Sequence, residues 1–462
     1  MKDRKTLLIL LAVVLAVRLA YFGLFRDRLF SGPSTQFEQA FAAISLLEGH
    51  GVSVPAVQPP VVSASDPDRF VDPATYELKD AARLPYIKEV PGYAFLLAGL
   101  WKLSGSRLWL WAQLLQILLE LIAAWGLWTL TRRFFGRRAA IGSVLVFAFL
   151  FHEARASVIP YKDIILLYVM LAAAFLAARV FEGGRESRRP WLPFALLCAA
   201  TGLGYYFMPN ILLYPFFAAA ALFLLRKIKL RTAIVFVLLA AAIVGAAVYP
   251  YQAYVRAHRH EPGVIPPLFW YRFWLGNQVR AFYSTEEERF QDHLRDRMAA
   301  TGQSLEEICR EEFFASVKAA PLAYAARTAR KLLFGTVMVY GNGGDAAYST
   351  SWSKFKADNP EAGFKAYARS RPGRILGMIL GTLSASLLFP LAIAAVIILG
   401  RRKKLAVALF FLHIPLYYIL LHMFFHYEAR YLLGTLPGYL PLVGFLLAAA
   451  TERRFKTRTP EA

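Results

Sequence analysis

SGPSTQFEQAFAAISLLEGHGVS, residues Ser31–Ser53, comes shortly after the apolar run TLLILLAVVLAVRLAYFGLF, residues Thr6–Phe25. A helix needs about 20 apolar residues to cross a bilayer, so Thr6–Phe25 is predicted to be a membrane span. The basic residues of Lys2–Lys5 precede this span, and positive charge stays on the cytoplasmic side. Residues Ser31–Ser53 are therefore expected on the outer face of the membrane.

The stretch Ser31–Ser53 is predicted to contain a short outer helix. Its apolar residues recur at helical spacing, namely Phe37, Phe41, Ile44 and Leu47. Gly49 and Gly51 follow and are expected to end the helix. Glu38 lies one turn after Thr35, so a carboxylate is expected directly beyond the first span.

Composition indicates a polytopic helical membrane protein. Of the 462 residues, 57% are hydrophobic and 15% aromatic, which excludes an ordinary soluble protein. The net charge of +22 comes largely from short basic clusters between apolar runs, which act as topology signals and contact lipid head groups rather than nucleic acid. The first run is longer than a signal-peptide core and lacks a convincing cleavage site, so an uncleaved anchor is expected. Cys198 and Cys309 predict neither a disulfide framework nor a metal site.

The apolar runs can be threaded through the membrane as about ten spans with every dense basic cluster inside. They are Thr6–Phe25, Leu108–Thr131, Ala139–Ser157, Ile164–Val180, Trp191–Phe207, Ile211–Leu225, Thr232–Tyr249, Ile375–Gly400, Leu405–Phe425 and Tyr431–Ala450. Both termini are then cytoplasmic. This predicts an N-terminal transmembrane module, 1–251, whose first outer loop is 26–107, then an outer segment, 252–374, and C-terminal transmembrane helices, 375–462.

Both outer regions are expected to carry helices of their own. Pro91–Leu103 is too short to span, and Trp101 with Lys102 at one end suits a helix in the membrane interface. A proline-rich extended stretch, Val54–Pro73, precedes it. In the large outer segment, a helical pattern from Ser304 to about Phe334 is interrupted near Pro321.

Ionisable residues gather on the outer side at four places that are far apart in the chain. They are Thr35 and Glu38, Lys88 and Glu89, Lys162 and Asp163, and His426, Glu428 and Arg430. Each alone can be a solvated loop end or an interfacial anchor, whereas their common side favours a functional site. Asp163 opens the fourth span, where the helix N-terminus stabilises a carboxylate. It is either a simple cap or a carboxylate held ionised as a base or orienting group.

Other polar residues lie inside the predicted spans. Arg18 and Glu120 are expected to be buried structural partners, and Glu153 could pair with Arg155. His413 and His422 are expected to be packed or hydrogen-bonded. No spacing typical of a metal site occurs, so no metal ligand is assigned and metal dependence is left open.

In their order and sidedness these motifs resemble the C-type membrane glycosyltransferases, especially the family 39 group of protein O-mannosyltransferases and aminoarabinose transferases. That family opens with a span and then Asp-x3-Tyr-x3-Ala-x2-Leu-x2-Gly-x-Gly on an outer helix. The matching residues here are Thr35, Gln39, Ala43, Leu46, Gly49 and Gly51. Further matches are Lys88 before Pro91-Gly92-Tyr93, the inner turn RRFFGRR, Asp163, Pro250-Tyr251 with Arg256, Gly276-Asn277, and Arg430-Tyr431 with Pro437.

The resemblance implies a GT-C-like fold in a bacterial inner membrane, with the active site on the periplasmic side. It further implies an inverting transfer from a polyprenyl-phosphate sugar to a lipid, protein or glycan acceptor, with no cofactor beyond that donor. Asp163 and Glu38 are the candidate catalytic carboxylates, and Lys88, Lys162 and Arg430 the candidate phosphate contacts. Further candidate substrate contacts are Thr35, Glu89, Glu428 and Tyr431. We expect Glu38, Lys88, Asp163 and Arg430 to line one outer cavity.

Two departures from the family pattern leave alternatives open. The first-helix aspartate, the usual base, is Thr35 here, and the arginine expected before the proline after span five is Met208. The active-site motif is therefore partly degenerate. The chain is expected to be a transferase, and the alternatives are a catalytically silent relative that binds lipid-linked sugar, an O-antigen polymerase or ligase, or a transporter.

Overall fold

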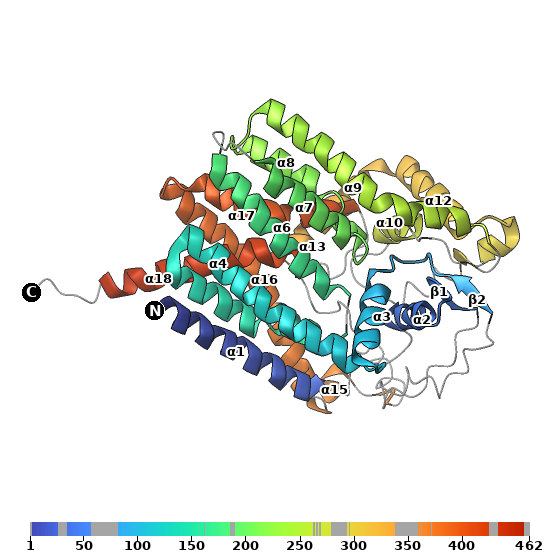
Figure 1. The fold of residues 1–462 in the computed structure, drawn as a ribbon, viewed down its shortest axis with the longest axis horizontal. Coiled ribbons are helices and arrows are strands. Elements are labelled where there is room, and N and C mark those ends of the chain that lie inside the picture. The colour runs from blue at the N-terminus through green and yellow to red at the C-terminus, as the bar shows by residue number, and fades with distance from the viewer. Residues whose placement is uncertain are drawn as a thin grey trace, which may run out of the picture. The chain divides into compact units, whose positions relative to one another are not determined.

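The chain divides into two compact units in the computed structural model (Figure 1). The first comprises Met1–Pro267, Leu391–Pro415 and Leu433–Ala462, and the second comprises Leu268–Pro390 and Leu416–Leu432. The residues that the structure describes are 2–25, 35–56, 82–160, 162–184, 190–261, 264, 267, 269–278, 293–294, 296–337, 359–361, 363–370, 372–424 and 433–456.

The first unit consists mainly of apolar helices. They are α1 (Lys2–Phe25), α4 (Trp109–Phe149), α6 (Ile164–Gly183), α7 (Trp191–Gly204), α8 (Tyr214–Leu224), α9 (Leu230–His258) and α18 (Leu436–Lys456), with parts of α16 (Pro372–Arg401) and α17 (Leu405–Phe424). Each predicted span overlaps one of these helices, although Phe425, Tyr431 and Leu432 lie outside the described residues. Among the described residues, 6 helices are long and apolar enough to cross a membrane. The polytopic helical architecture is thereby confirmed, and the number of about ten spans stays a prediction.

Helix α4 contains two of the predicted spans because the chain reverses within it. Thr131 donates a side-chain hydrogen bond to Ser143 over 3.2 Å, whereas twelve residues of straight helix would separate them by about 18 Å. The reversal occurs at Gly136, whose φ of 83° and ψ of 178° suit glycine. The turn RRFFGRR therefore joins two antiparallel helices, as predicted, and its place on the inner side stays a prediction.

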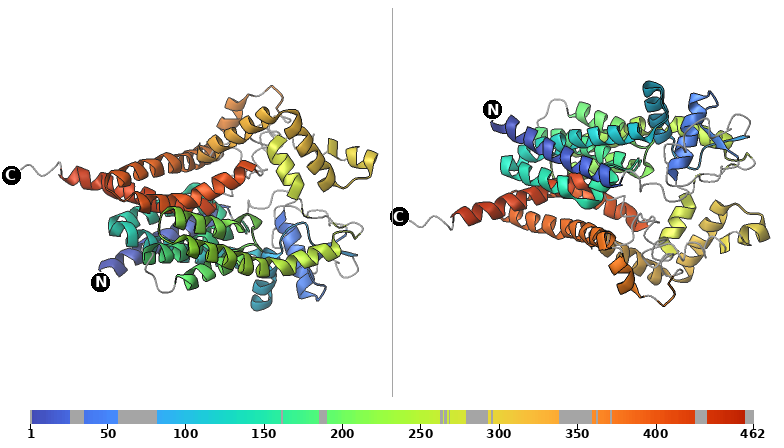
Figure 2. Two further views of the ribbon diagram at one scale, coloured as in Figure 1. Left: turned by 90° about the horizontal axis from the view of Figure 1, so that it is seen from above. Right: turned by 90° about the horizontal axis from the view of Figure 1, so that it is seen from below.

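Helix α18 packs along α4 within the first unit (Figure 2). The approach is close at Gly444, where an added Cβ would lie 2.3 Å from the carbonyl oxygen of Ala139. Only glycine leaves room for the two backbones at this point, so a side chain there would force the helices apart.

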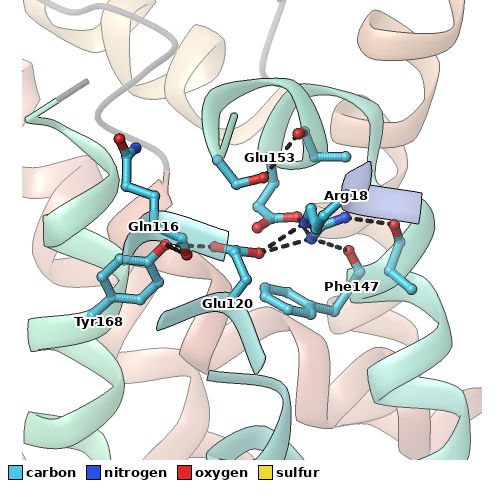
Figure 3. Close-up of polar contacts among 9 residues, drawn as sticks. Arg18, Gln116, Glu120, Phe147, Glu153 and Tyr168 are labelled. Atoms are coloured by element: carbon cyan, nitrogen blue, oxygen red, sulfur yellow. Dashed lines mark hydrogen bonds and ion pairs between the residues drawn. The ribbon is translucent and has the colours of Figure 1, made fainter. Parts of the chain in front are cut away.

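A buried ionic network centred on Arg18 joins helices within the first unit (Figure 3). Arg18 of α1 donates through Nε and Nη2 to Glu120 Oε2, at 3.0 and 2.8 Å. Its Nη2 also pairs with Glu153 of the short helix α5 (Phe151–Ala156). The three side chains are 0% exposed. Glu153 thus pairs with Arg18, where the sequence suggested Arg155, and the structural partnership of Arg18 and Glu120 is confirmed.

Backbone and phenol groups complete this network. Arg18 Nη1 donates to the carbonyl oxygen of Ala148 over 2.8 Å, and the Tyr168 hydroxyl donates to Glu120 Oε1 over 2.8 Å. Four elements, α1, α4, α5 and α6, are therefore tied together by one guanidinium and two carboxylates. Buried charges of this kind are tolerated because they are paired and hydrogen-bonded.

One end of the first unit contains two short helices and a strand pair (Figure 1). Helix α2 (Thr35–Leu47) packs on α3 (Gly92–Ser104), with Phe41, Ile44, Tyr93 and Trp101 in the shared apolar core. Strand β1 (Ser53–Pro55) pairs antiparallel with β2 (Arg83–Pro85), Val54 opposite Leu84. Both helices match the prediction, and Gly49 and Gly51 have positive φ after α2. The strand pair was not predicted, and residues 57–73 of the predicted extended stretch lie outside the described residues.

Two further elements end differently from the sequence-based expectation. The seventh span, expected to end at Tyr249, continues as α9 to His258 with Pro250 inside the helix. After α7, a short 3-10 helix, η5 (Pro209–Ile211), precedes α8. The extension of α9 matters because Tyr251 and Val255 pack against Ile87 and Val90, next to the candidate site.

The second unit contains α10 (Phe269–Gln278), α12 (Leu305–Ala319), α13 (Pro321–Val337) and α15 (Phe364–Ser370). The predicted helical break near Pro321 is confirmed between α12 and α13. Ser304 and Glu307 form a capping box at the start of α12. Glu306 accepts hydrogen bonds from the backbone N–H groups of Trp270 and Tyr271 over 2.7 and 3.1 Å, so α12 caps the first turn of α10.

Candidate functional site

The connector between β2 and α3, residues 86–91, carries the central pair of the candidate site, Lys88 and Glu89. Its backbone is anchored from several directions. The Tyr86 N–H donates to the carbonyl of Val52 over 2.9 Å, and the Gly92 N–H donates to the carbonyl of Tyr206 over 2.7 Å. A Cβ at Gly92 would lie 2.4 Å from that Tyr206 oxygen, so the approach requires glycine.

Tyr251 of α9 anchors the connector at its centre. Its hydroxyl lies 3.0 Å from the carbonyl oxygen of Ile87 and 2.9 Å from that of Glu89, and donates to them. These two residues flank Lys88, so the main chain of the lysine is held on both sides. A helix distant in sequence therefore sets where the Lys88 side chain begins.

Two ion pairs extend from this connector to other elements. Lys88 Nζ lies 2.8 Å from Glu38 Oε1 of α2, and the two side chains are 25% and 14% exposed. Lys162, in the turn before α6, pairs with Glu89 at side-chain exposures of 11% and 7%. The structure therefore brings together Glu38, Lys88, Glu89 and Lys162 from three segments that lie far apart in the chain.

Asp163 follows Lys162 directly and is the N-cap residue of α6. Its side chain is 1% exposed and makes no capping hydrogen bond to the first turn. The role of a simple side-chain cap is therefore not realised, although a carboxylate at this position is still favoured by the helix dipole. The structure thus places a buried carboxylate next to Lys162 at the N-terminal end of α6.

The remaining predicted site residues are placed only in part. Thr35 is the first residue of α2, one turn before Glu38, and only its backbone is described. Glu428, Arg430 and Tyr431 lie outside the described residues, as does His426. The prediction that Arg430 shares one cavity with Glu38, Lys88 and Asp163 therefore stays a prediction.

The structure adds a polar frame whose role the sequence did not reveal. Gln39, fully buried beside Glu38, donates to the Tyr86 hydroxyl over 3.1 Å and to the Val90 carbonyl over 3.2 Å. Its Oε1 accepts the Ala94 N–H at 3.0 Å, near the start of α3. Gln39 and Tyr251 both belong to the family-like motifs, which was the available signal, but their partners are far away in sequence.

The pKa of Tyr86 reflects the electrostatics around the hydrogen bonds of Gln39. Burial raises the pKa of Tyr86 well above its usual value, and the carboxylates of Glu89 and Glu38 raise it further. The phenol therefore stays neutral and serves as a hydrogen-bonding group rather than as a proton donor at neutral pH. In the described part of the chain, no group of three or more His, Cys, Asp and Glu residues is arranged to hold a metal ion.

Comparison with known proteins places this geometry in context. Residues 88–251 match the family described as dolichyl-phosphate-mannose-protein mannosyltransferase. No curated protein sequence matches the chain significantly. The matched segment begins at Lys88 and ends at Tyr251, so it contains residues 88–91 of the connector, the Lys162-Asp163 turn and the tyrosine that anchors the connector.

Solved structures share the fold over nearly the whole chain. ArnT from Cupriavidus metallidurans, bound to undecaprenyl phosphate, has a TM-score of 0.51 and 14% identity over 97% of this chain and 61% of its own. The oligosaccharyltransferase AglB from Archaeoglobus fulgidus, in complex with an inhibitory peptide and a dolichol-phosphate, has a TM-score of 0.51 and 13% identity, covering 99% of this chain and 51% of its own. The chain thus spans less than two thirds of either protein, and at this identity the likeness concerns the fold.

Proposed function

We propose that this chain, which has the fold of the C-type membrane glycosyltransferases, moves a sugar from a polyprenyl-phosphate donor to an acceptor at the outer face of a bacterial inner membrane. The acceptor is a hydroxyl or phosphate of a lipid, protein or glycan, and the transfer inverts the anomeric carbon. Both termini are cytoplasmic in this proposal, and the donor lipid enters from the bilayer.

One observation carries the proposal, namely that the connector 86–91 gathers ammonium groups and carboxylates from three segments beside Asp163. A lipid-phosphate donor needs cations to hold the leaving phosphate and a carboxylate to accept the acceptor proton. The ion pairs Glu38–Lys88 and Glu89–Lys162 supply both kinds of group. The family match over 88–251 supports the same assignment.

The reaction can be written with these groups. The acceptor oxygen bonds to the anomeric carbon, and the bond from that carbon to the phosphate oxygen breaks. The electron pair leaves with the polyprenyl phosphate, held by Lys88, Lys162 and Arg430. The acceptor proton passes to a carboxylate, either Asp163 or Glu38, while Thr35, Glu89, Glu428 and Tyr431 contact the substrates.

The test is transfer of label from polyprenyl-phosphate sugars in membranes that contain the full chain. Asp163→Asn is expected to lower transfer by about a hundredfold or more, because it removes a carboxylate that acts on the acceptor proton. Glu182→Gln is the matched control, since Glu182 lies at the opposite end of α6 and pairs with Arg133. Membrane insertion is measured for both variants. Full transfer by Asp163→Asn, at equal insertion, would contradict the catalytic assignment.

The alternative function is binding of a lipid-linked sugar without transfer. It is favoured by Thr35, which stands where the family has its first-helix aspartate, because a hydroxyl is not a base at neutral pH. The same labelled donors separate the two functions. Donor that binds the purified chain, with no label passing to any acceptor or to water, would indicate the silent relative.

A further inference from the structure

Helix α3 has one buried apolar face and one exposed apolar face. Ala94, Leu97 and Trp101 are buried in the core that α3 shares with α2. On the other side of the helix, Phe95 is 47% and Leu103 is 87% exposed. An exposed apolar face of this kind is typical of a surface that another apolar medium covers.

Helix α4, a candidate membrane span, begins shortly after α3 ends and indicates which medium this is (Figure 1). It exposes apolar side chains at helical spacing, namely Trp111, Leu114, Leu118, Ile122 and Trp125. From Trp111 to the exposed Arg132, α4 rises about 30 Å, which equals the thickness of the hydrocarbon core of a bilayer. Trp111 therefore marks one boundary of the membrane, and the exposed end of α3 precedes that boundary directly.

The turn between the two helices, which we call the corner 101–111, binds its own polar groups. Trp101 Nε1 donates to the carbonyl oxygen of Leu108 over 3.1 Å, and Trp111 Nε1 donates to the Ser106 hydroxyl over 2.8 Å. The Ser104 hydroxyl donates to the carbonyl oxygen of Ser106 over 3.0 Å. Tryptophan is enriched at the membrane interface, where polar groups need partners. The corner 101–111 can thus contact lipid with these groups paired.

The charges at the corner 101–111 are positive in excess. Lys102 and Arg107 are the only charged residues in the sequence 90–119, and the Lys102 side chain is exposed. Arg107, 22% exposed, lies 3.4 Å from Glu48, but the same carboxylate also pairs with Arg83 over 2.8 Å. One carboxylate therefore faces two guanidinium groups, with an exposed ammonium nearby in the chain. Such an excess fits the phosphate of an anionic phospholipid.

We propose that the corner 101–111 binds the phosphate of an anionic phospholipid through Lys102 and Arg107, while Phe95 and Leu103 lie among the acyl chains of the same leaflet. The sequence predicted a helix in the membrane interface, and the proposal assigns its lipid-facing side, its two cations and the class of lipid. It does not depend on sugar transfer. The site is distinct from the one around the connector 86–91, because α3 separates Lys102 from the connector by about 15 Å of helix.

The experiment measures lipid contact at position 103 of the full chain in nanodiscs of phosphatidylcholine. Leu103→Cys carries a bimane label, and the buried Cys198 and Cys309 are replaced by alanine. A small share of the lipid is phosphatidylglycerol or, in a parallel sample, phosphatidylcholine, each with a spin label on an acyl chain that quenches a nearby bimane. Arg259→Cys is the control position, because Arg259 is exposed and lies about 40 Å along α9 from its start, beyond the thickness of the hydrocarbon core.

Both spin-labelled lipids are expected to quench position 103 more than position 259, and phosphatidylglycerol should quench position 103 more than phosphatidylcholine does. Lys102→Gln and Arg107→Gln should each lower this preference for phosphatidylglycerol about fivefold, since each removes one cation near the membrane surface. Arg256→Gln is the matched control, because it removes one exposed cation from α9 instead. Its preference should equal that of the wild type.

Each outcome decides the proposal. Equal quenching at positions 103 and 259 overturns it, because α3 would then lie outside the bilayer. Quenching without a preference for phosphatidylglycerol, or a preference that survives Lys102→Gln, overturns the phosphate site. An equal loss in Arg256→Gln also overturns it, since total charge would then be the cause. A preference that falls with Lys102→Gln and not with Arg256→Gln supports it, and because Lys102 is exposed this test does not require breaking the Arg107–Glu48 pair.

Discussion

The network around Arg18 and the ion pairs around Lys88 use the same chemistry in two different environments. Arg18, Glu120 and Glu153 are fully buried, whereas Lys88 and Glu38 are partly exposed. A buried charge that loses its partner is costly, while a partly exposed pair contributes little to stability and can exchange partners. The difference predicts that losing a partner costs more stability in the Arg18 network than in the Glu38–Lys88 pair.

Removing Arg18 tests the structural side of this comparison and has the largest expected effect. Arg18→Met leaves Glu120 and Glu153 buried without their cation, which should destabilise the protein by about 3–5 kcal/mol. Thermal unfolding in detergent and the folded yield measure the loss. Arg18→Met combined with Glu120→Gln and Glu153→Gln should recover much of it, because the buried charges are then gone. A single variant as stable as the wild type would show that the network is not structural.

Removing the Tyr168 hydroxyl tests the same buried network with a smaller expected loss of stability. Tyr168→Phe removes the hydrogen bond to Glu120 Oε1, which should lower stability by about 1–2 kcal/mol. Transfer by the folded fraction should stay close to that of the wild type, since the Tyr168 hydroxyl donates to Glu120 and to the Gln116 carbonyl and is assigned no substrate contact. If Tyr168→Phe lost transfer without losing stability, the result would contradict a purely structural role for the Arg18 network.

Tyr251 offers the counterpart at the candidate site, where its hydroxyl holds the connector 86–91. Tyr251→Phe removes both hydrogen bonds to the connector and should lower transfer about fivefold, in line with roughly 1 kcal/mol of positioning. The thermal midpoint should fall less than for Tyr168→Phe. If Tyr251→Phe and Tyr168→Phe lost equal stability and Tyr251→Phe kept full transfer, the hydrogen bonds of Tyr251 would be purely structural, as those of the Arg18 network are expected to be.

The elements formed by local sequence were largely predictable. Apolar length located the spans, helical spacing located α2 and α3, and glycines with positive φ follow α2. The reversal between the second and third spans followed from the basic turn that contains Gly136. The strand pair β1–β2 was missed, because each strand is short and forms only when paired with a segment far along the chain.

The sequence did not predict which charged residues pair when they lie far apart in the chain. It named Glu38, Lys88, Glu89 and Lys162 as candidates on one side of the membrane, but it could not tell which carboxylate would meet which ammonium. It proposed Arg155 for Glu153, since residues near in sequence are the ones a local pattern can relate, and the structure chose Arg18. The anchoring of the connector by Tyr251 likewise required α9 to continue beyond Pro250.

The apolar helices of the membrane protein and the short helices α2 and α3 thus follow from the chain itself, because they depend on composition and on contacts within a few residues. The site depends on tertiary structure, because its ion pairs form only after α2, the connector and the start of α6 are packed together. The stretch after the first predicted span forms the helix α2, which begins at Thr35. Its Glu38 meets Lys88, fifty residues further along the chain, only because the fold brings the connector against α2.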